Sequence, residues 1–131
     1  MRFIFVVVGF GLSLLAYSQQ QPSAQGPPRY DKNGESTYKG SIVDVQDRPS
    51  SVTGGTGTRL LIRTADEKVL EVHLGGARLV HEYGLSLRAG DAIEITGVKV
   101  HLAGADAILA RKMKRGSQEF VFRDNEGNPI W

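Results

Sequence analysis

Residues 59–74 read RLLIRTADEKVLEVHL, and this stretch carries the clearest structural pattern in the chain. Its two ends, 59–64 and 68–74, alternate apolar with mostly polar side chains, which is the two-residue period of strands that bury one face. Three small or polar residues at 65–67 separate the two ends, so the stretch predicts a β-hairpin. The predicted inward-facing residues are Leu60, Ile62, Leu70, Val72 and Leu74. The predicted outward-facing residues are Arg59, Leu61, Arg63, Val69, Glu71 and His73.

One strand is predicted before this hairpin. It covers 36–47, STYKGSIVDVQD, with a bulge or bend at Gly40. The glycine-rich segment 48–58, RPSSVTGGTGT, predicts a flexible hairpin loop. This segment lacks the Lys-Ser/Thr pair of a P-loop, and no helical pattern follows it, so a phosphate-binding loop is not predicted. Ahead of the strand, 30–35 predicts a turn, because Asn-Gly tolerates positive φ.

A short helix and further strands are predicted after the hairpin. Gly75-Gly76 breaks the strand, and 77–83, ARLVHEY, fits a helix that Gly84 ends. The remaining predicted strands cover 92–100, 107–114 and 118–123.

The predicted order is therefore three strands, one helix and two or three strands, which is the order of an OB-fold. The predicted fold class is all-β with a small helical content. It is an OB-fold-like Greek-key barrel of five to six strands, with one short helix between strands 3 and 4. A small open antiparallel sandwich is the alternative. The strands after the helix add Ile93, Ile95 and Ile108 to the predicted core.

The N-terminal segment has the features of a secretory signal peptide. Met1-Arg2 supplies a positive start, and 3–16 is almost wholly apolar. Ala16 and Ser18 place small residues at positions −3 and −1, so cleavage is predicted after Ser18, before Gln19. An uncleaved anchor is the alternative, but the apolar run is shorter than the roughly 20 residues that span a bilayer.

Three segments follow from this division of the chain. Residues 1–18 are the predicted signal peptide and 19–29 a disordered tether of Gln, Pro, Ser and Gly, while 30–131 form the OB-fold-like domain. The mature chain is expected to be periplasmic or secreted, with no stable membrane insertion after cleavage.

Composition removes several classes of chemistry. The chain has no cysteine, which excludes disulfides, thiolate nucleophiles, zinc–thiolate sites and CxxCH haem attachment. It carries 16 Lys and Arg against 14 Asp and Glu, and loss of Arg2 leaves 15 against 14, a balance that does not by itself indicate a polyanionic partner. His81-Glu82 begins like HExxH, but residue 85 is Leu. No nucleophile–base or acid–base pair is recognisable, so the protein is predicted not to be an enzyme and to need no cofactor.

Five short pieces also carry a family resemblance. They are Tyr30-Asp31, Lys39-Gly40, EVHLG at 71–75, GDAIEITG at 90–97 and RDNEGNPIW at 123–131. In order and spacing they resemble a family of exported bacterial OB-fold-like domains, similar to the C-terminal domain of magnetosome MamS/MamX-type proteins. The resemblance implies a periplasmic module without known catalytic residues. Haem-binding relatives carry CxxCH, so a redox role does not transfer to this cysteine-free chain.

Two histidines are weak candidates for a metal site. His73 ends the predicted hairpin on the face opposite the core, and His81 lies on the following helix. A helix folded back at Gly75-Gly76 would bring both imidazoles near Glu71 or Glu82, which are suitable ligands. The alternative is two histidines with separate local hydrogen bonds.

A basic run at 111–115 is the strongest local charge feature. Its cations, Arg111, Lys112, Lys114 and Arg115, suit a nucleic-acid backbone, as in many OB-folds that bind single strands. Such binding also uses exposed aromatic rings, and the strands 59–64 and 68–74 contain none. The alternative is a solvated strand end whose charges discourage edge-to-edge pairing.

Aromatic residues gather near the C-terminus. Phe120 and Phe122 share one face of the last predicted strand, and Trp131 is placed to cover them as a lid. Together with Ile130 they form either a docking surface beside the basic run or the closure of a small core.

The sequence therefore predicts a non-enzymatic binding module of the cell envelope. Its expected partner is another envelope protein, bound through the barrel surface or a sheet edge. A nucleic-acid-binding OB-fold and a weak metal-binding module are the alternatives.

Overall fold

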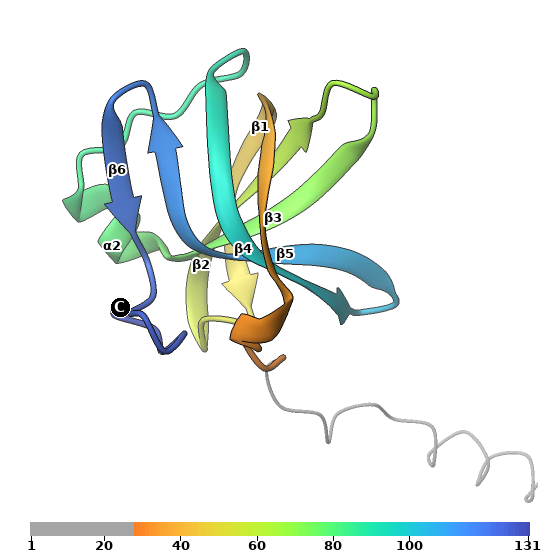
Figure 1. The fold of residues 1–131 in the computed structure, drawn as a ribbon. Helices are drawn as coiled ribbons and strands as arrows, with labels where there is room; N and C mark the ends of the chain where they lie inside the picture. The colour runs from red at the N-terminus through yellow and green to blue at the C-terminus, as the bar shows by residue number, and fades with distance from the viewer. Residues whose placement is uncertain (1–27) are drawn as a thin grey trace, which may run out of the picture.

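The computed structural model describes residues 28–131, so the predicted signal peptide and residues 19–27 of the predicted tether lie outside the described residues. A 3-10 helix, η2 (Lys32–Gly34), forms the turn predicted at 30–35, with the Asp31 side chain accepting a hydrogen bond from the Asn33 N–H. One α-helix, α2 (Ala77–Glu82), lies between the third and fourth strands (Figure 1). The strands are β1 (Glu35–Ser50), β2 (Gly55–Arg63), β3 (Val69–Gly76), β4 (Ala92–Leu102), β5 (Ala105–Arg115) and β6 (Gln118–Val121).

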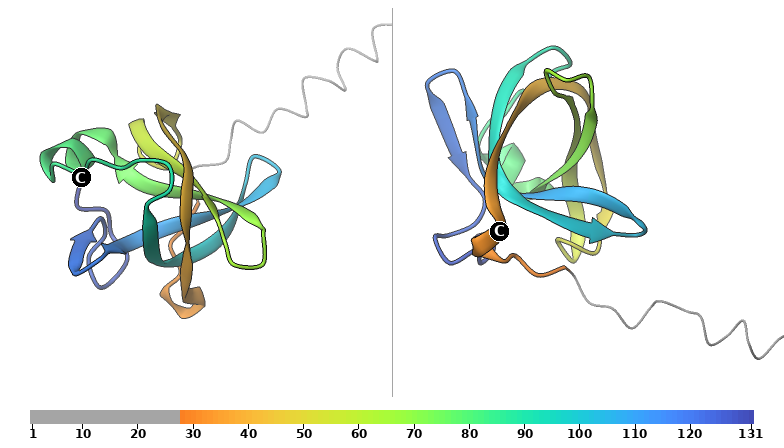
Figure 2. Two further views of the ribbon diagram at one scale, coloured as in Figure 1. Left: turned by 90° about the horizontal axis from the view of Figure 1, so that it is seen from above. Right: turned by 45° about the vertical axis from the view of Figure 1, so that its right-hand side comes forward.

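The strands form one sheet that closes into a barrel. Their order is β3-β2-β1-β4-β5-β6, and β3 closes the ring by pairing with β5. This closing pair is parallel and joins only Val72 to Ile108 and His73 to Leu109, whereas all other neighbours are antiparallel. The right-hand view of Figure 2 shows the ring, with β6 lying outside it beside β5. The predicted OB-fold-like barrel is confirmed, and the alternative of an open sandwich is wrong.

The long strand β1 belongs to both halves of the barrel. Its first part pairs with β4 up to Ser41, and its second part pairs with β2 from Ser41 onward. The register shift lies between Ile42 and Asp44, not at Gly40 as a bulge there would require. Gly40 serves a close backbone approach instead, because a Cβ atom there would lie 2.6 Å from the Arg63 carbonyl oxygen.

The core contains the residues that the alternating pattern selects. Every predicted core residue is fully buried except Leu70, which packs partly buried against the same cluster. The helix α2 contributes buried Val80 and covers one end of the cluster. A second, smaller core forms on the other side of the β4–β5 pair from Val52, Val98 and Leu109.

Two boundary predictions are wrong for the same reason. The loop expected over 48–58 is only a turn at 51–54, since β1 continues to Ser50 and β2 starts at Gly55. The strand expected to break at Gly75-Gly76 continues through both glycines. Strand ladders are made by backbone groups, so polar and glycine-rich segments extend them whenever a neighbouring strand is present. Val52, buried in the second core, anchors the short turn.

The C-terminal segment folds back onto the barrel. Arg123 is buried, and its guanidinium carbon lies 5.2 Å from the centre of the Tyr30 ring and 5.0 Å from that of Trp131. Its Nη1 donates to the Gly127 carbonyl oxygen at 2.9 Å, and burial lowers the pKa of this guanidinium. Trp131 in turn covers Gly75 and Gly76, where Cβ atoms would lie 2.8 Å and 3.1 Å from its ring. Trp131 therefore packs on the two glycines of β3 and against the main core, whereas the prediction placed it beside Phe120 and Phe122.

Substitution of Gly75 by alanine is expected to displace Trp131. Gly75 has a φ of 154°, which disfavours other residues, and an added Cβ would collide with the indole. We expect a loss of about 1–3 kcal/mol in the free energy of unfolding and a red shift in the fluorescence of the chain's single tryptophan. Gly84→Ala is the matched control, because Gly84 has a φ of 67° but no atom within 4 Å of the added Cβ. An unchanged emission spectrum in Gly75→Ala would contradict this packing.

Candidate functional site

The basic run of β5 is largely neutralised by carboxylates from other strands. Arg111 forms a bidentate pair with Glu35, with its Nε 2.7 Å from Oε2 and its Nη2 2.9 Å from Oε1. Lys112 pairs with Glu119 at 3.2 Å, and Arg115 pairs with Asp91 at 3.6 Å. Within the described part of the chain, Lys114 is the member of the run without an ion pair. The run therefore presents little free positive charge to a polyanion.

The aromatic group belongs mainly to the core. Phe122 has no exposed surface, so it is not part of an accessible docking face, and the core-closure alternative describes it correctly. Phe120 and Trp131 are partly buried against the same core. Both phenylalanine rings contact Tyr83, with centroids 5.7 Å and 5.9 Å apart. Ile130 remains exposed.

The two candidate metal-binding histidines contact different carboxylates. His73 Nε2 lies 2.7 Å from Glu71 Oε2, and His81 Nε2 lies 3.1 Å from Asp47 Oδ2. Across residues 28–131, no group of three or more His, Asp or Glu side chains is arranged to hold a metal ion. His73 is also only 7% exposed, although it lies on the outer side of β3. The hairpin pattern could not indicate this burial, because Leu109 and the β1–β2 turn, which lie beside His73, are distant in sequence.

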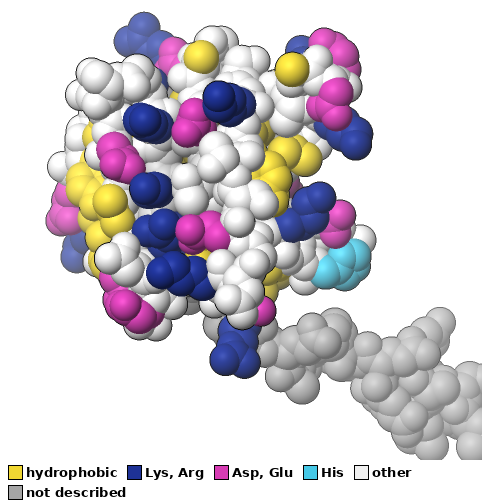
Figure 3. All heavy atoms as spheres, in the orientation of Figure 1, with side chains coloured by type: hydrophobic (Ala, Val, Ile, Leu, Met, Phe, Trp, Pro, Cys, Tyr) yellow, Lys and Arg dark blue, Asp and Glu magenta, His cyan; other side chains and the backbone are white. Residues whose placement is uncertain are grey.

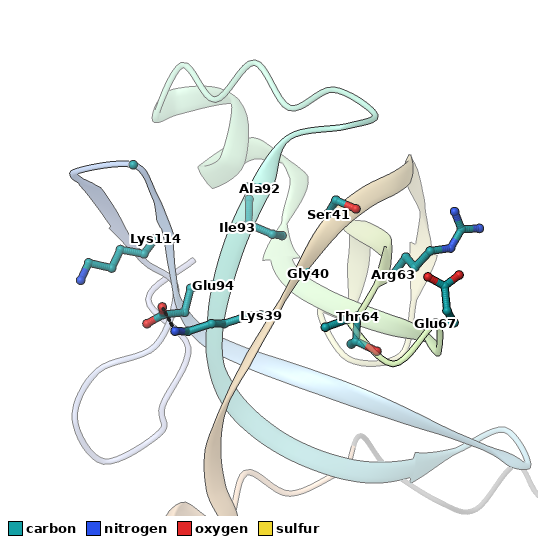
Figure 4. Close-up of a pocket in the computed structure, with 12 residues that line it drawn as sticks. Lys39, Gly40, Ser41, Arg63, Thr64, Glu67, Ala92, Ile93, Glu94 and Lys114 are labelled. Atoms are coloured by element: carbon teal, nitrogen blue, oxygen red, sulfur yellow. Dashed lines mark ion pairs between the residues drawn. The ribbon is translucent and has the colours of Figure 1, made fainter.

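A groove opens where β1 passes from β4 to β2. It has a volume of about 640 Å³ and lies around Gly40. In Figure 4, Lys39, Glu94 and Lys114 lie on one side of β1, and Arg63, Thr64 and Glu67 lie on the other. Lys39 and Glu94 form an ion pair at 3.8 Å. Charges of both signs line this open groove, which gives it no clear preference for an anion or a cation.

The visible surface has the same mixed character. Figure 3 shows basic and acidic side chains interspersed over the face that carries β1, β4, β5 and β6. A nucleic-acid-binding surface normally gathers its positive charge into one patch or stripe. On this face the basic side chains are mixed with acidic ones and are not gathered into one stripe.

A second groove lies at the seam between β3 and β5. Because only two residue pairs join these strands, the β2–β3 and β4–β5 hairpins diverge beyond them, as Figure 1 shows on the right of the barrel. The seam groove has a volume of about 370 Å³, and hydrophobic side chains are visible between the charged hairpin ends in Figure 3. Val69, at its rim, is 51% exposed. The groove is lined by Lys68, Val69, Leu70, Glu71, Lys99, Asp106, Ala107 and Ile108.

Both strands turn unused backbone groups toward the seam groove. The Thr64 N–H donates to the Lys68 carbonyl oxygen at 2.9 Å, so the backbone carbonyl of Lys68 points toward β2. Backbone groups of successive residues in an antiparallel strand point to alternate sides, so the N–H and carbonyl of Val69 point away from β2. Ala103 and Gly104, both with positive φ, form the two-residue turn between β4 and β5. In such a hairpin the flanking residues, Leu102 and Ala105, are hydrogen-bonded to each other. By the same alternation, Asp106 directs its N–H and carbonyl away from β4. Within residues 28–131, neither Val69 nor Asp106 has a strand partner on the side of the seam groove, so the groove has an open strand edge on each side.

The comparisons with known proteins give a family for this chain and a solved structure to which it is similar. The model of the MamS/MamX magnetosome protein family matches residues 35–120. Among solved structures, the chain is similar to the N-terminal domain of the PriB protein from Thermoanaerobacter tencongensis, whose structure is described as dimeric. Sequence identity is 16% and the TM-score 0.49, and the match covers 66% of this chain and 99% of that chain. No curated protein matches the chain. Among the described helices, none is long and apolar enough to cross a membrane.

Proposed function

The chain belongs to the MamS/MamX magnetosome protein family, and from that membership we propose that it is a non-catalytic accessory domain of the cell envelope that binds another protein. In this proposal an extended segment of the partner adds as a strand at the seam groove. The N-terminal segment 1–18 directs export and is removed after Ser18, leaving the domain periplasmic or secreted.

The free strand edges at the seam groove carry this proposal. Strand addition derives its affinity from main-chain hydrogen bonds, and it derives its specificity from pockets for alternate side chains. Val69 supplies an unpaired N–H and carbonyl on one side, and Asp106 supplies them on the other. The exposed apolar side chain of Val69, between the charged Lys68 and Asp106, suits a strand that alternates apolar and polar side chains.

A proline at Val69 is expected to weaken partner capture roughly tenfold, which corresponds to the loss of one hydrogen bond. Proline removes the N–H that faces the seam groove, and the first position of a strand tolerates it without loss of the β2–β3 ladder. Val69→Thr is the matched control, because it keeps both the N–H and the β-branched shape. Asp106→Pro, with Asp106→Asn as its control, tests the other edge in the same way.

The measurement is affinity capture from the envelope fraction of the native host. The full-length chain carries a tag inserted between residues 21 and 22, beyond the predicted cleavage site, so the mass of the captured chain also reports whether cleavage follows Ser18. Thermal unfolding checks that each proline variant folds. If no captured protein approaches the molar amount of the tagged native chain, the interaction proposal is wrong. If both proline variants capture the same partner as well as their controls, the partner binds elsewhere and strand addition at the seam groove is wrong.

A further inference from the structure

A small pocket lies where the β1–β2 turn meets the outer face of β2 and β3, apart from the seam groove. Its volume is about 120 Å³. The walls come from the end of β1, the turn that follows it, and the facing parts of the next two strands. The lining residues are Arg48, Pro49, Ser50, Ser51, Gly57, Arg59 and His73.

The two charged side chains that line this pocket, Arg48 and Arg59, are both basic. Arg48, Arg59 and His73 line it and no carboxylate does, whereas the groove around Gly40 and the seam groove each contain two acidic residues. Arg48 forms no ion pair within residues 28–131. The pocket therefore combines a free guanidinium with a second arginine and a histidine.

Two contacts position Arg59, the second arginine, but they do not use all of its N–H donors. Arg59 stands between Gln46 and His73 in the cross-strand register. Its Nη2 lies 3.4 Å from Gln46 Oε1, and its Nη1 lies 3.5 Å from Glu71 Oε2. A guanidinium has five N–H donors, and both contacts are long, so donors remain for a ligand.

The histidine forms a fixed wall of the pocket. Only 7% of the His73 surface is exposed. Its Nε2 lies 2.7 Å from Glu71 Oε2, the same oxygen that Arg59 approaches. Its Nδ1 has no hydrogen bond to the described residues, so the ring is oriented by Glu71 and keeps one polar edge free.

Gly57 keeps the turn close enough to complete the pocket. A Cβ at Gly57 would lie 2.8 Å from Thr53 Cγ2, so glycine is what allows the turn to fold over β2. The Ser50 hydroxyl accepts a hydrogen bond from the Val52 N–H at 3.0 Å, which holds the turn in this position. The hydroxyls of Ser50 and Ser51 keep their own O–H donors at the rim.

We propose that this pocket binds a phosphate group. Two guanidinium groups and hydroxyl donors around a small cavity are the donor set that recognises a tetrahedral oxyanion, because arginine offers planar, paired N–H donors to phosphate oxygens. The phosphate group is bound either as the free anion or as the projecting headgroup of a lipid. The site is independent of strand addition at the seam groove.

The test titrates inorganic phosphate into ¹⁵N-labelled protein purified from the envelope of its host, at low ionic strength. Saturable shifts are expected for the amides of Ser50, Ser51 and Gly57. Arg48→Gln is expected to weaken the apparent affinity at least tenfold, as loss of a charge-assisted hydrogen bond does. Arg63→Gln is the matched control, because within residues 28–131 the exposed Arg63 of β2 also forms no ion pair and it lies outside this pocket.

A second arm separates the two sources of phosphate. Co-sedimentation with phosphatidylglycerol vesicles, compared with phosphatidylcholine vesicles, is measured for the same three proteins. Saturable binding of inorganic phosphate that depends on Arg48 assigns the free anion. Vesicle binding that depends on Arg48, without a response to inorganic phosphate, assigns the lipid headgroup. If neither probe binds, or if Arg48→Gln and Arg63→Gln lose affinity equally in both arms, the proposed site is wrong.

Discussion

Replacement of Phe122 by alanine is expected to lower the free energy of unfolding by about 3–5 kcal/mol, the usual cost of removing a fully buried phenylalanine. Phe122 has no exposed surface and packs against Tyr83 in the main core. The cost has two parts, the lost burial of the ring and the cavity that the surrounding core residues fill only partly. Chemical denaturation monitored by far-UV circular dichroism measures it.

The neighbouring residue supplies the control for this prediction. Val121 precedes Phe122 in the chain but is 37% exposed, so Val121→Ala is expected to cost less than about 1 kcal/mol. Aromatic side chains next to arginines are also typical of docking surfaces. This pair of variants therefore decides whether Phe122 stabilises the core or serves as a docking residue. A small loss of stability in Phe122→Ala would contradict its place in the core.

Replacement of Arg111 by methionine is expected to cost on the order of 3 kcal/mol, because it leaves the Glu35 carboxylate buried without its partner. The two side chains are only 12% and 17% exposed. Methionine keeps most of the apolar stem of arginine, so the loss reports the ion pair and not the packing. Lys112→Met is the control, since the Lys112–Glu119 pair is much more exposed and is expected to contribute less than about 1 kcal/mol.

The same ion pair predicts how stability depends on pH. Hydrogen bonds from Arg111, helped by one from Tyr30 and opposed by burial, lower the pKa of Glu35 from its usual 4.5 to about 2. A carboxylate with a lowered pKa in the folded state stabilises the protein above its unfolded-state pKa and loses that contribution as pH falls. The native chain should therefore lose about 3 kcal/mol between pH 4.5 and pH 2 from this group. In Arg111→Met that part of the pH dependence should largely disappear, and an identical acid profile in both proteins would contradict the assignment.

Local periodicity in the sequence was enough to predict several parts of this protein. Alternation over 59–74 placed the β2–β3 hairpin and selected its inward-facing residues, all of which lie in or against the core. Glycine at position 84 marked the end of α2, where its φ is 67°. The order of strands around that helix was sufficient to predict the OB-fold-like barrel. These features could be predicted because each depends on neighbours a few residues away.

Contacts between distant segments determine which basic side chains form ion pairs and which strand edges remain open. Arg111 is neutralised by Glu35, 76 residues away in the chain, so the basic run that suggested a polyanion partner is mostly paired. His73 is buried because Leu109 and the β1–β2 turn lie beside it, which its own strand pattern could not indicate. The seam groove exists because β3 and β5 share only two residue pairs. Ion pairs, burial and strand edges depend on distances between segments remote in sequence, and only closure of the barrel fixes those distances.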